Sequence, residues 1–412
     1  MKNLIKGKHI WWQRPYIRTE GDMDEERKAS WLELFWDLIF VAAIAELSHF
    51  MMHGIHGFHD VFTLMLLFVP VWWIWNGVTF YNERYEMNNV RHRVLMFVTM
   101  LPVAGIAYTI HDALGTLANL FAIFNIVARL ILTYMWMTAH RTELEKKLCT
   151  HFSIGLLVSS GLFLVSVFVD PAYRIILWSA AIIADLASPL FSLDIQARLP
   201  RISISHLPER FGLLIILTLG ETVISSFKGL SDIKTFNWLT LILAAESLLI
   251  TFMIWWLYID HVMYRVFKPG LWYALSWCYL HLPLFIAIIG LSASVGIITS
   301  AQYTSAWQHV PTALQWQLAI LLSVVLLVLI LINIVSESHD HHHKLIDFHD
   351  RIERDLIVYK FLGLVFIMGV VLLGNAVISP VFLLLAVIAG LCFPVINGLY
   401  IWVNASLNKP AH

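Results

Sequence analysis

The feature that most constrains this chain is a series of long apolar runs, each about as long as a membrane-crossing helix. About 20 mostly apolar residues are needed to span the hydrocarbon core of a bilayer as a helix. The approximate bounds of the twelve runs are 31–52, 59–80, 93–111, 115–139, 151–169, 172–191, 209–228, 236–259, 272–297, 314–335, 357–376 and 379–403. The sequence therefore predicts an all-α polytopic membrane protein with about twelve transmembrane helices, whose main partner is the lipid bilayer.

The composition agrees with this class. Only 13% of the 412 residues are charged, whereas a soluble domain carries about 25%. The net charge of −1 and the absence of a basic patch with interleaved aromatic residues argue against a nucleic-acid partner. The three cysteines are far apart, so no disulfide framework is expected. Residues 1–30 are polar and basic without a cleavable signal peptide, and we expect them to form a cytoplasmic arm.

The positions of the basic residues predict how the chain is oriented. If the N-terminus is cytoplasmic, the segments on the inner side hold 23 of the 27 Lys and Arg residues, and the outer segments hold only Arg174, Lys228 and Lys234. Arg129 lies within an apolar run. Cytoplasmic loops of membrane proteins carry an excess of Lys and Arg. This pattern predicts twelve spans with both termini in the cytoplasm.

The two halves of the chain share short stretches in the same order. LELFWDLIFVAAI from Leu32 aligns with PERFGLLIILTLG from Pro208, and two further matches are Trp72-Trp73 with Trp255-Trp256 and Leu101-Pro102 with Leu282-Pro283. These matches favour two parallel six-helix repeats related by an axis along the membrane normal, as in some transporters. The predicted divisions are repeats at 31–191 and 209–403, a cytoplasmic linker at 192–208, a His-rich cytoplasmic loop at 336–356 and a cytoplasmic tail at 404–412.

Four motifs resemble those of a known family. WLELFWDLIFV at 31–41, WWIWNGVTFYNERY at 72–85, HLPERFGLLIILTLGET at 206–222 and WWLYID at 255–260 are similar to the bacterial low temperature requirement protein A family. The resemblance covers most of the chain and implies a multi-pass protein of the bacterial inner membrane, linked to growth in the cold. It implies little biochemistry. Asn88-Asn89 stand where the family leads us to expect an acidic pair, which weakens any cation role for that loop.

The predicted spans contain polar groups that are costly in lipid. The candidate ion-, proton- or substrate-binding residues are Glu33, Asp37, Glu46, Arg129, Asp185, Glu209, Glu221, Glu246 and His281. An ionised acid at membrane depth must be paired, protonated or bound to a cation. Because Arg129 is the only basic residue deep in a predicted span, we expect it to contact Glu46, Glu221 or Glu246. The alternative is a structural polar network that joins helices.

Simpler explanations exist for some of these residues. Glu33 and Asp37 share one helix face and are expected either to cap or salt-bridge a helix end or to form an acidic site. Glu209 follows Pro208 at a helix start, which favours a cap. Glu46 and Glu221 have similar predicted depths and are expected to face one central cavity. His281, beside Pro283, is either a proton relay or a packing residue.

No enzyme motif accompanies these residues. The sequence has no Walker loop, GxSxG, HExxH or CxxC, so we expect neither enzyme activity nor a cofactor. The five histidines from His339 to His349 are a possible metal-binding site. However, their spacing matches no standard zinc finger, and the run falls in a polar loop. The sequence predicts a membrane transporter coupled to a proton or another cation through buried carboxylates. The alternative is a lipid-handling, sensory or assembly protein with a structural polar core.

Overall fold

The structure is a computed structural model of the whole chain. It describes residues 15–17, 28–52, 58–86, 89–200, 202–203, 205–231, 238–263, 265–300, 309–338, 346–374 and 378–407.

Long helices account for nearly all of the described structure, and twelve of those described are long and apolar enough to cross a membrane. They are α1 (Trp31–Met52), α2 (Phe58–Arg84), α3 (Val90–Thr109), α4 (Ala118–Met137), α5 (Glu143–Phe168), α6 (Pro171–Ala187), α8 (His206–Ser231), α9 (Trp238–Tyr258), α10 (Leu271–Thr299), α11 (Thr312–Val335), α12 (Ile346–Gly374) and α13 (Pro380–Leu407). Each corresponds to one apolar run of the sequence. The prediction of an all-α polytopic membrane protein is therefore confirmed.

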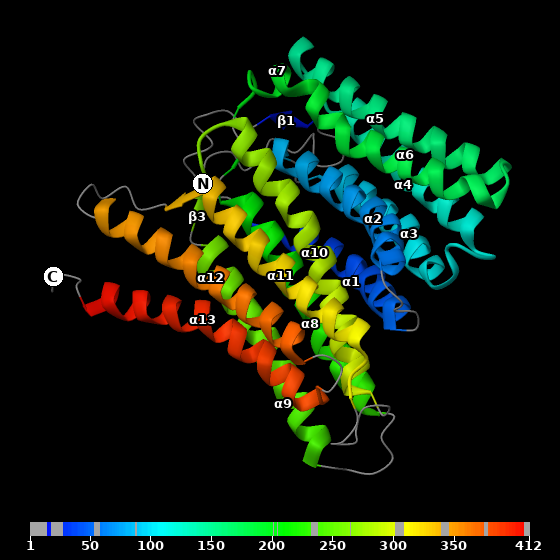
Figure 1. Cartoon of the computed structure of the whole chain (residues 1–412). Helices are drawn as coiled ribbons and strands as arrows, with labels where there is room; N and C mark the ends of the chain where they lie inside the picture. The colour runs from blue at the N-terminus through cyan, green and yellow to red at the C-terminus, as the bar shows by residue number, and fades with distance from the viewer. Residues whose placement is uncertain are drawn as a thin grey trace. The chain divides into compact units, whose positions relative to one another are not determined.

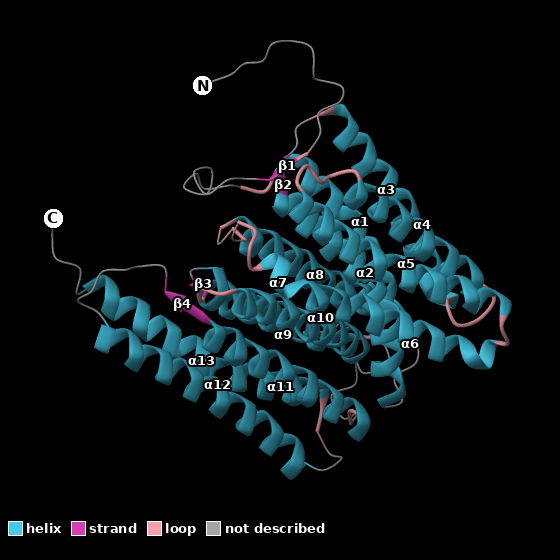
Figure 2. Ribbon diagram, turned by 90° about the horizontal axis from the view of Figure 1, so that it is seen from above, coloured by secondary structure: helices cyan, strands magenta, loops and turns pink. Residues whose placement is uncertain are grey.

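The remaining elements are short. They comprise the helical turns η2 (Ile110–Asp112), η3 (Ser188–Ser192), α7 (Leu193–Gln196) and η4 (Ile259–Met263), and the strands β1 (Tyr16–Ile17), β2 (Tyr85–Glu86), β3 (Arg265–Phe267) and β4 (Ser336–Ser338). Two antiparallel ribbons form from these strands, β1 with β2 and β3 with β4 (Figure 2). The first ribbon ties the segment before α1 to the end of α2.

The chain divides into two compact units. The first contains the residues up to Leu47 together with Phe62–Arg210, and the second contains Ser48–Val61 together with the residues from Phe211 onward. In the first unit α5 packs between α4 and α6, and the three helices lie side by side (Figure 1). In the second unit α11 packs between α10 and α12, and α13 packs against α12 and α9. The six-plus-six repeat and the cytoplasmic placement of the termini stay predictions.

Side-chain caps explain where several helices begin. Ser30 and Glu33 form a reciprocal capping box at the start of α1: Glu33 Oε2 accepts from the Ser30 backbone N–H at 2.8 Å, and Ser30 Oγ accepts from the Glu33 N–H at 3.3 Å. Asn89 and Thr142 cap α3 and α5 in the usual way, each accepting from the N–H three residues later. These caps satisfy backbone donors that helix starts leave free.

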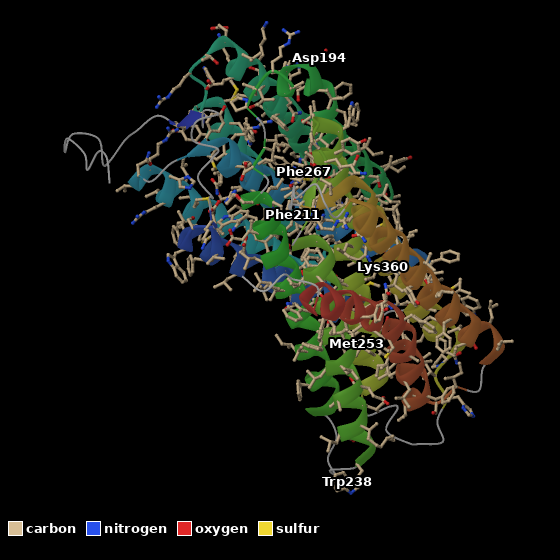
Figure 3. All side chains as sticks on the ribbon, turned by 90° about the vertical axis from the view of Figure 1, so that its left-hand side faces the viewer. Asp194, Phe211, Trp238, Met253, Phe267 and Lys360 are labelled. Carbon is tan, nitrogen blue, oxygen red and sulfur yellow. The ribbon has the colours of Figure 1, made fainter. Side chains whose placement is uncertain are left out.

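Apolar residues cover both the interior and much of the surface. Large exposed apolar side chains include Phe168 and Leu373, as expected for helices that face lipid. Trp238 is 73% exposed at the tip of α9 (Figure 3). An interfacial position suits a tryptophan with this exposure. Lys360 of α12 is fully buried; its position is labelled in Figure 3.

Candidate functional site

A group of buried polar side chains in the first unit draws residues from three of the four motifs. We call it the His206 cluster; its members are Glu33 and Asp37 of α1, Trp75 and Glu83 of α2, and His206 and Arg210 of α8. Asp37, Trp75, His206 and Arg210 have no exposed surface, and the two glutamates have very little. Three carboxylates, an imidazole and a guanidinium are thus removed from solvent together.

One half of the cluster is a tightly held ion pair. Arg210 donates through Nη1 to Asp37 Oδ2 and through Nη2 to Asp37 Oδ1, both at 2.8 Å. The indole N–H of Trp75 donates to the same Oδ1 at 2.8 Å, and the guanidinium lies 5.8 Å from the Trp75 ring centroid. A bidentate Arg–carboxylate pair is strong and fixes the geometry of both side chains. The pair therefore fastens the start of α8 to α1 and α2.

The other half places an imidazole between two carboxylates. His206 Nδ1 lies 2.6 Å from Glu83 Oε2, and Nε2 lies 3.3 Å from Glu33 Oε1. A neutral imidazole carries a hydrogen on only one ring nitrogen. The Nδ1 contact with Glu83 is a hydrogen bond, whereas the Nε2 contact with Glu33 is an ion pair only when the imidazole carries a second proton. A second proton on the ring would complete the contact between Nε2 and Glu33.

Local structure holds both glutamates in place for this contact. Glu33 uses its other oxygen, Oε2, in the capping box with Ser30. Glu83 Oε1 accepts from the Ser203 N–H at 2.6 Å, and Ser203 Oγ accepts from the His206 N–H at 3.2 Å. Each glutamate thus has one oxygen that accepts from the backbone N–H of a serine preceding a helix, and one oxygen facing His206. Glu33 both caps α1 and belongs to the cluster, so its expected roles as a cap and as part of an acidic site are compatible.

The segment before α8 is also tied to the end of α2 by Arg84. Its Nη1 donates to the Pro200 carbonyl oxygen at 2.6 Å. Arg84 follows Glu83 directly, so the two neighbouring side chains hold the same short segment at two points. This double attachment positions His206 at the first residue of α8.

Arg129 does not contact Glu46, Glu221 or Glu246 as we expected; its partner is Asp185. Arg129 Nη2 lies 2.7 Å from Asp185 Oδ2, and neither side chain is more than 1% exposed. Arg129 is 11 residues into α4 and Asp185 is 14 residues into α6. At about 1.5 Å per residue, they are at similar distances from the starts of helices that both pack on α5.

Further contacts surround the Arg129 pair, although Asp185 Oδ1 has no hydrogen-bond partner among the described residues. Arg129 Nη1 donates to Asn125 Oδ1 at 2.8 Å, and its guanidinium lies 4.9 Å from the Phe163 ring centroid. Ser159 donates to Asp185 Oδ2 at 3.0 Å. Hydrogen-bonded polar groups of this kind join membrane helices. For Arg129 and Asp185 the structure thus favours the structural reading.

His281 has the surroundings of a packing residue. Its Nδ1 pairs with the Trp277 carbonyl oxygen at 2.8 Å and its Nε2 with the Tyr258 hydroxyl at 3.0 Å. The ring also contacts Trp277 and Phe211. Phe211 is labelled in Figure 3, as is Phe267, which packs against Trp277 as well. Both ring nitrogens are satisfied without a carboxylate.

The remaining candidates are spread over several helices. Glu209 is half-buried and accepts from the Ala29 N–H at 2.9 Å, a role closer to capping than to binding. Glu46 is half-buried in α1, whereas Glu221 is buried in α8 and accepts from Ser225. Glu246 is buried in α9, and neither of its oxygens has a hydrogen-bond partner among the described residues. A shared cavity for Glu46 and Glu221 stays a prediction.

Sequence reasoning missed His206, Glu83 and Trp75 as site residues. All three lie inside motifs that carry the family resemblance, and this position could have identified them as candidates. His206 and Glu83 were overlooked because they fall at the ends of apolar runs, where a polar residue is ordinary. Arg210 likewise looks like a common helix-start residue. Of the His-rich run, His339, His341, His342 and His343 lie outside the described residues, and no side-chain placement is described for His349.

Comparison with known proteins adds a family but no chemistry. Residues 28–399 match the family model described as bacterial low temperature requirement A protein (LtrA). A protein of Rhizobium meliloti, described only as uncharacterized, is 27% identical over 265 residues, which cover 59% of this chain and 60% of the relative. The chain thus spans less than two thirds of that relative's length. No solved structure matches.

Proposed function

We propose, from the premise that this chain belongs to the bacterial low temperature requirement A protein (LtrA) family, that it is a membrane transporter coupled to protons through the His206 cluster. The observation that carries the proposal is the position of His206 between the carboxylates of Glu33 and Glu83. Ionisable groups inside a membrane protein are expensive to bury and commonly mark ion or proton pathways.

The second proton on the ring of His206 gives the site two states with different stability. With the proton present, both ring nitrogens of His206 meet their carboxylates through a hydrogen. When the proton leaves, an imidazole lone pair faces a carboxylate oxygen at one of the two contacts, and this contact becomes repulsive. Loss of the proton therefore favours separation of the start of α8 from either α1 or α2. Such a change of helix position linked to protonation is what a coupled transporter requires.

Arg210 and Asp37 act as the fixed part of this device. Their bidentate pair lies one helical turn along α8 from His206, since the two residues are four apart. The pair holds α8 to α1 in both states of the imidazole. Movement on proton release is then directed to the first turn of α8 and the segment before it, which Arg84 and Glu83 attach to α2.

The alternative is a non-transport membrane factor with a structural polar core. The buried, hydrogen-bonded Arg129–Asp185 pair is the observation that favours it. A structural role for that pair leaves the His206 cluster unexplained, because three carboxylates around one imidazole and one guanidinium are a costly way to join helices. We therefore prefer the transporter.

The test is proton flux in proteoliposomes. The purified chain is reconstituted with a pH-sensitive dye inside, and a panel of ions and metabolites is added outside. We expect at least one solute to drive proton movement that vesicles without protein do not show. We expect Glu83→Gln, which keeps the side-chain shape, to lose this flux, while Glu143→Gln on the exposed start of α5 keeps it.

Two results would count against the proposal. A folded Glu83→Gln variant with wild-type flux would remove the His206 cluster from the mechanism. A wild-type protein that moves no protons with any solute of the panel would favour the structural alternative.

A further inference from the structure

A second buried polar group lies in the second unit, where hydroxyl groups meet one carboxylate. Ser225 of α8 donates to Glu221 Oε1 at 2.7 Å, and its Oγ also lies 3.2 Å from Ser48 Oγ of α1. All three side chains are at most 1% exposed. Three side-chain oxygen centres from two helices are therefore in contact in the interior.

The helices around this group pack closely. A Cβ added to Gly296 of α10 would lie 2.9 Å from Met52 Cε and 3.3 Å from Ser225 Cβ, so α1, α8 and α10 meet here. Thr222 of α8 also pairs with Ser292 of α10 at 2.6 Å. The oxygen atoms are thus held by packed helices rather than by a loop.

The serine hydroxyls do not follow the usual pattern for membrane helices. A buried serine in a helix commonly donates to the carbonyl four residues earlier, and Ser226 and Ser247 do so. Ser225 instead donates to the Glu221 carboxylate, and Ser48 contacts Ser225 across the helices. The hydroxyls of Ser225 and Ser48 are therefore directed toward one another and toward an acid.

We propose that Glu221, Ser225 and Ser48 form a binding site for an alkali-metal cation. Carboxylate and hydroxyl oxygens are hard donors, which suit hard cations rather than transition metals. The group supplies one carboxylate, whose single negative charge matches a monovalent ion, whereas calcium sites use several carboxylate and carbonyl oxygens. This site is separate from the His206 cluster and does not depend on the transport proposal.

The experiment measures binding rather than transport. Thermal unfolding of the purified full chain in detergent is followed in equal concentrations of sodium chloride, potassium chloride and choline chloride. We expect sodium or potassium to raise the unfolding midpoint by at least about 3 °C relative to choline, because a ligand that binds only the folded state stabilises it. Glu221→Gln and Ser225→Ala should each remove this difference.

Glu246→Gln is the matched control, since it neutralises another buried glutamate of the same unit that no hydroxyl contacts among the described residues. It should keep the cation effect. Ser48→Ala, on a different helix, gives an independent test if the α8 variants do not fold. Equal midpoints in all three salts, or a cation effect that survives Glu221→Gln or Ser48→Ala, would overturn the proposal.

Discussion

Arg210 and Asp37 form a bidentate ion pair with no exposed surface, in which both hydrogen bonds measure 2.8 Å. The two residues are 173 positions apart in the chain. Breaking a buried pair by removing one charge leaves the other without compensation, which costs about 3–5 kcal/mol. Loss of either charge should therefore lower the free energy of unfolding substantially, because the pair links α1 to α8.

The first prediction concerns this pair. Asp37→Asn keeps the size of the side chain and removes the charge that holds Arg210, so we expect the free energy of unfolding to fall by about 3–5 kcal/mol. Thermal unfolding in detergent measures the change. Glu143→Gln is the control, because its contact with Lys146 is exposed, and it should change stability by less than about 1 kcal/mol. Equal stability of Asp37→Asn and Glu143→Gln would contradict the prediction.

The second prediction separates the cost of a lone charge from the value of the Arg129–Asp185 pair. Arg129→Met leaves Asp185 buried without its cation and should destabilise the fold by about 3–5 kcal/mol. Adding Asp185→Asn to that variant removes the stranded charge, and we expect a substantial part of the lost stability to return. The readout is the unfolding midpoint of wild type, both single variants and the double variant. A double variant less stable than Arg129→Met would show that the pair is not coupled as described.

The third prediction concerns orientation. The distribution of Lys and Arg predicts that both termini and positions 145 and 345 lie in the cytoplasm, and that position 305 lies outside. Reporter fusions at these three points should be active on the corresponding sides. A reporter at 345 found on the outer side would refute the predicted topology.

The sequence was sufficient for the helices but not for the pairing of charges. Apolar runs of spanning length predicted every long helix among the described residues, because lipid leaves the backbone little alternative. Predicted depth did not identify the partner of Arg129: Asp185 lies at a comparable position and on a helix that shares a neighbour with α4. Pairing depends on which helices pack together and on which of their faces are in contact. The sequence of a single helix determines neither.

The His206 cluster is a second case in which the sequence did not identify the partners of buried charged residues. Glu33 and Asp37 were expected as candidates because two acids in an apolar run are unusual. Their partners, His206 and Glu83, are at the ends of apolar runs, where polar residues are common. Only the fold brings the ends of α1, α2 and α8 together. The motifs contained these residues, but their chemistry became visible only from the contacts.

Two histidine variants test the central claim most directly. In proteoliposomes, His206→Gln should lose solute-driven proton flux, because glutamine cannot carry the second proton between Glu33 and Glu83. His281→Gln replaces a buried histidine whose ring nitrogens pair with a hydroxyl and a carbonyl. If it elutes as a folded protein, it should keep the flux. Wild-type flux in a folded His206→Gln variant would contradict the account.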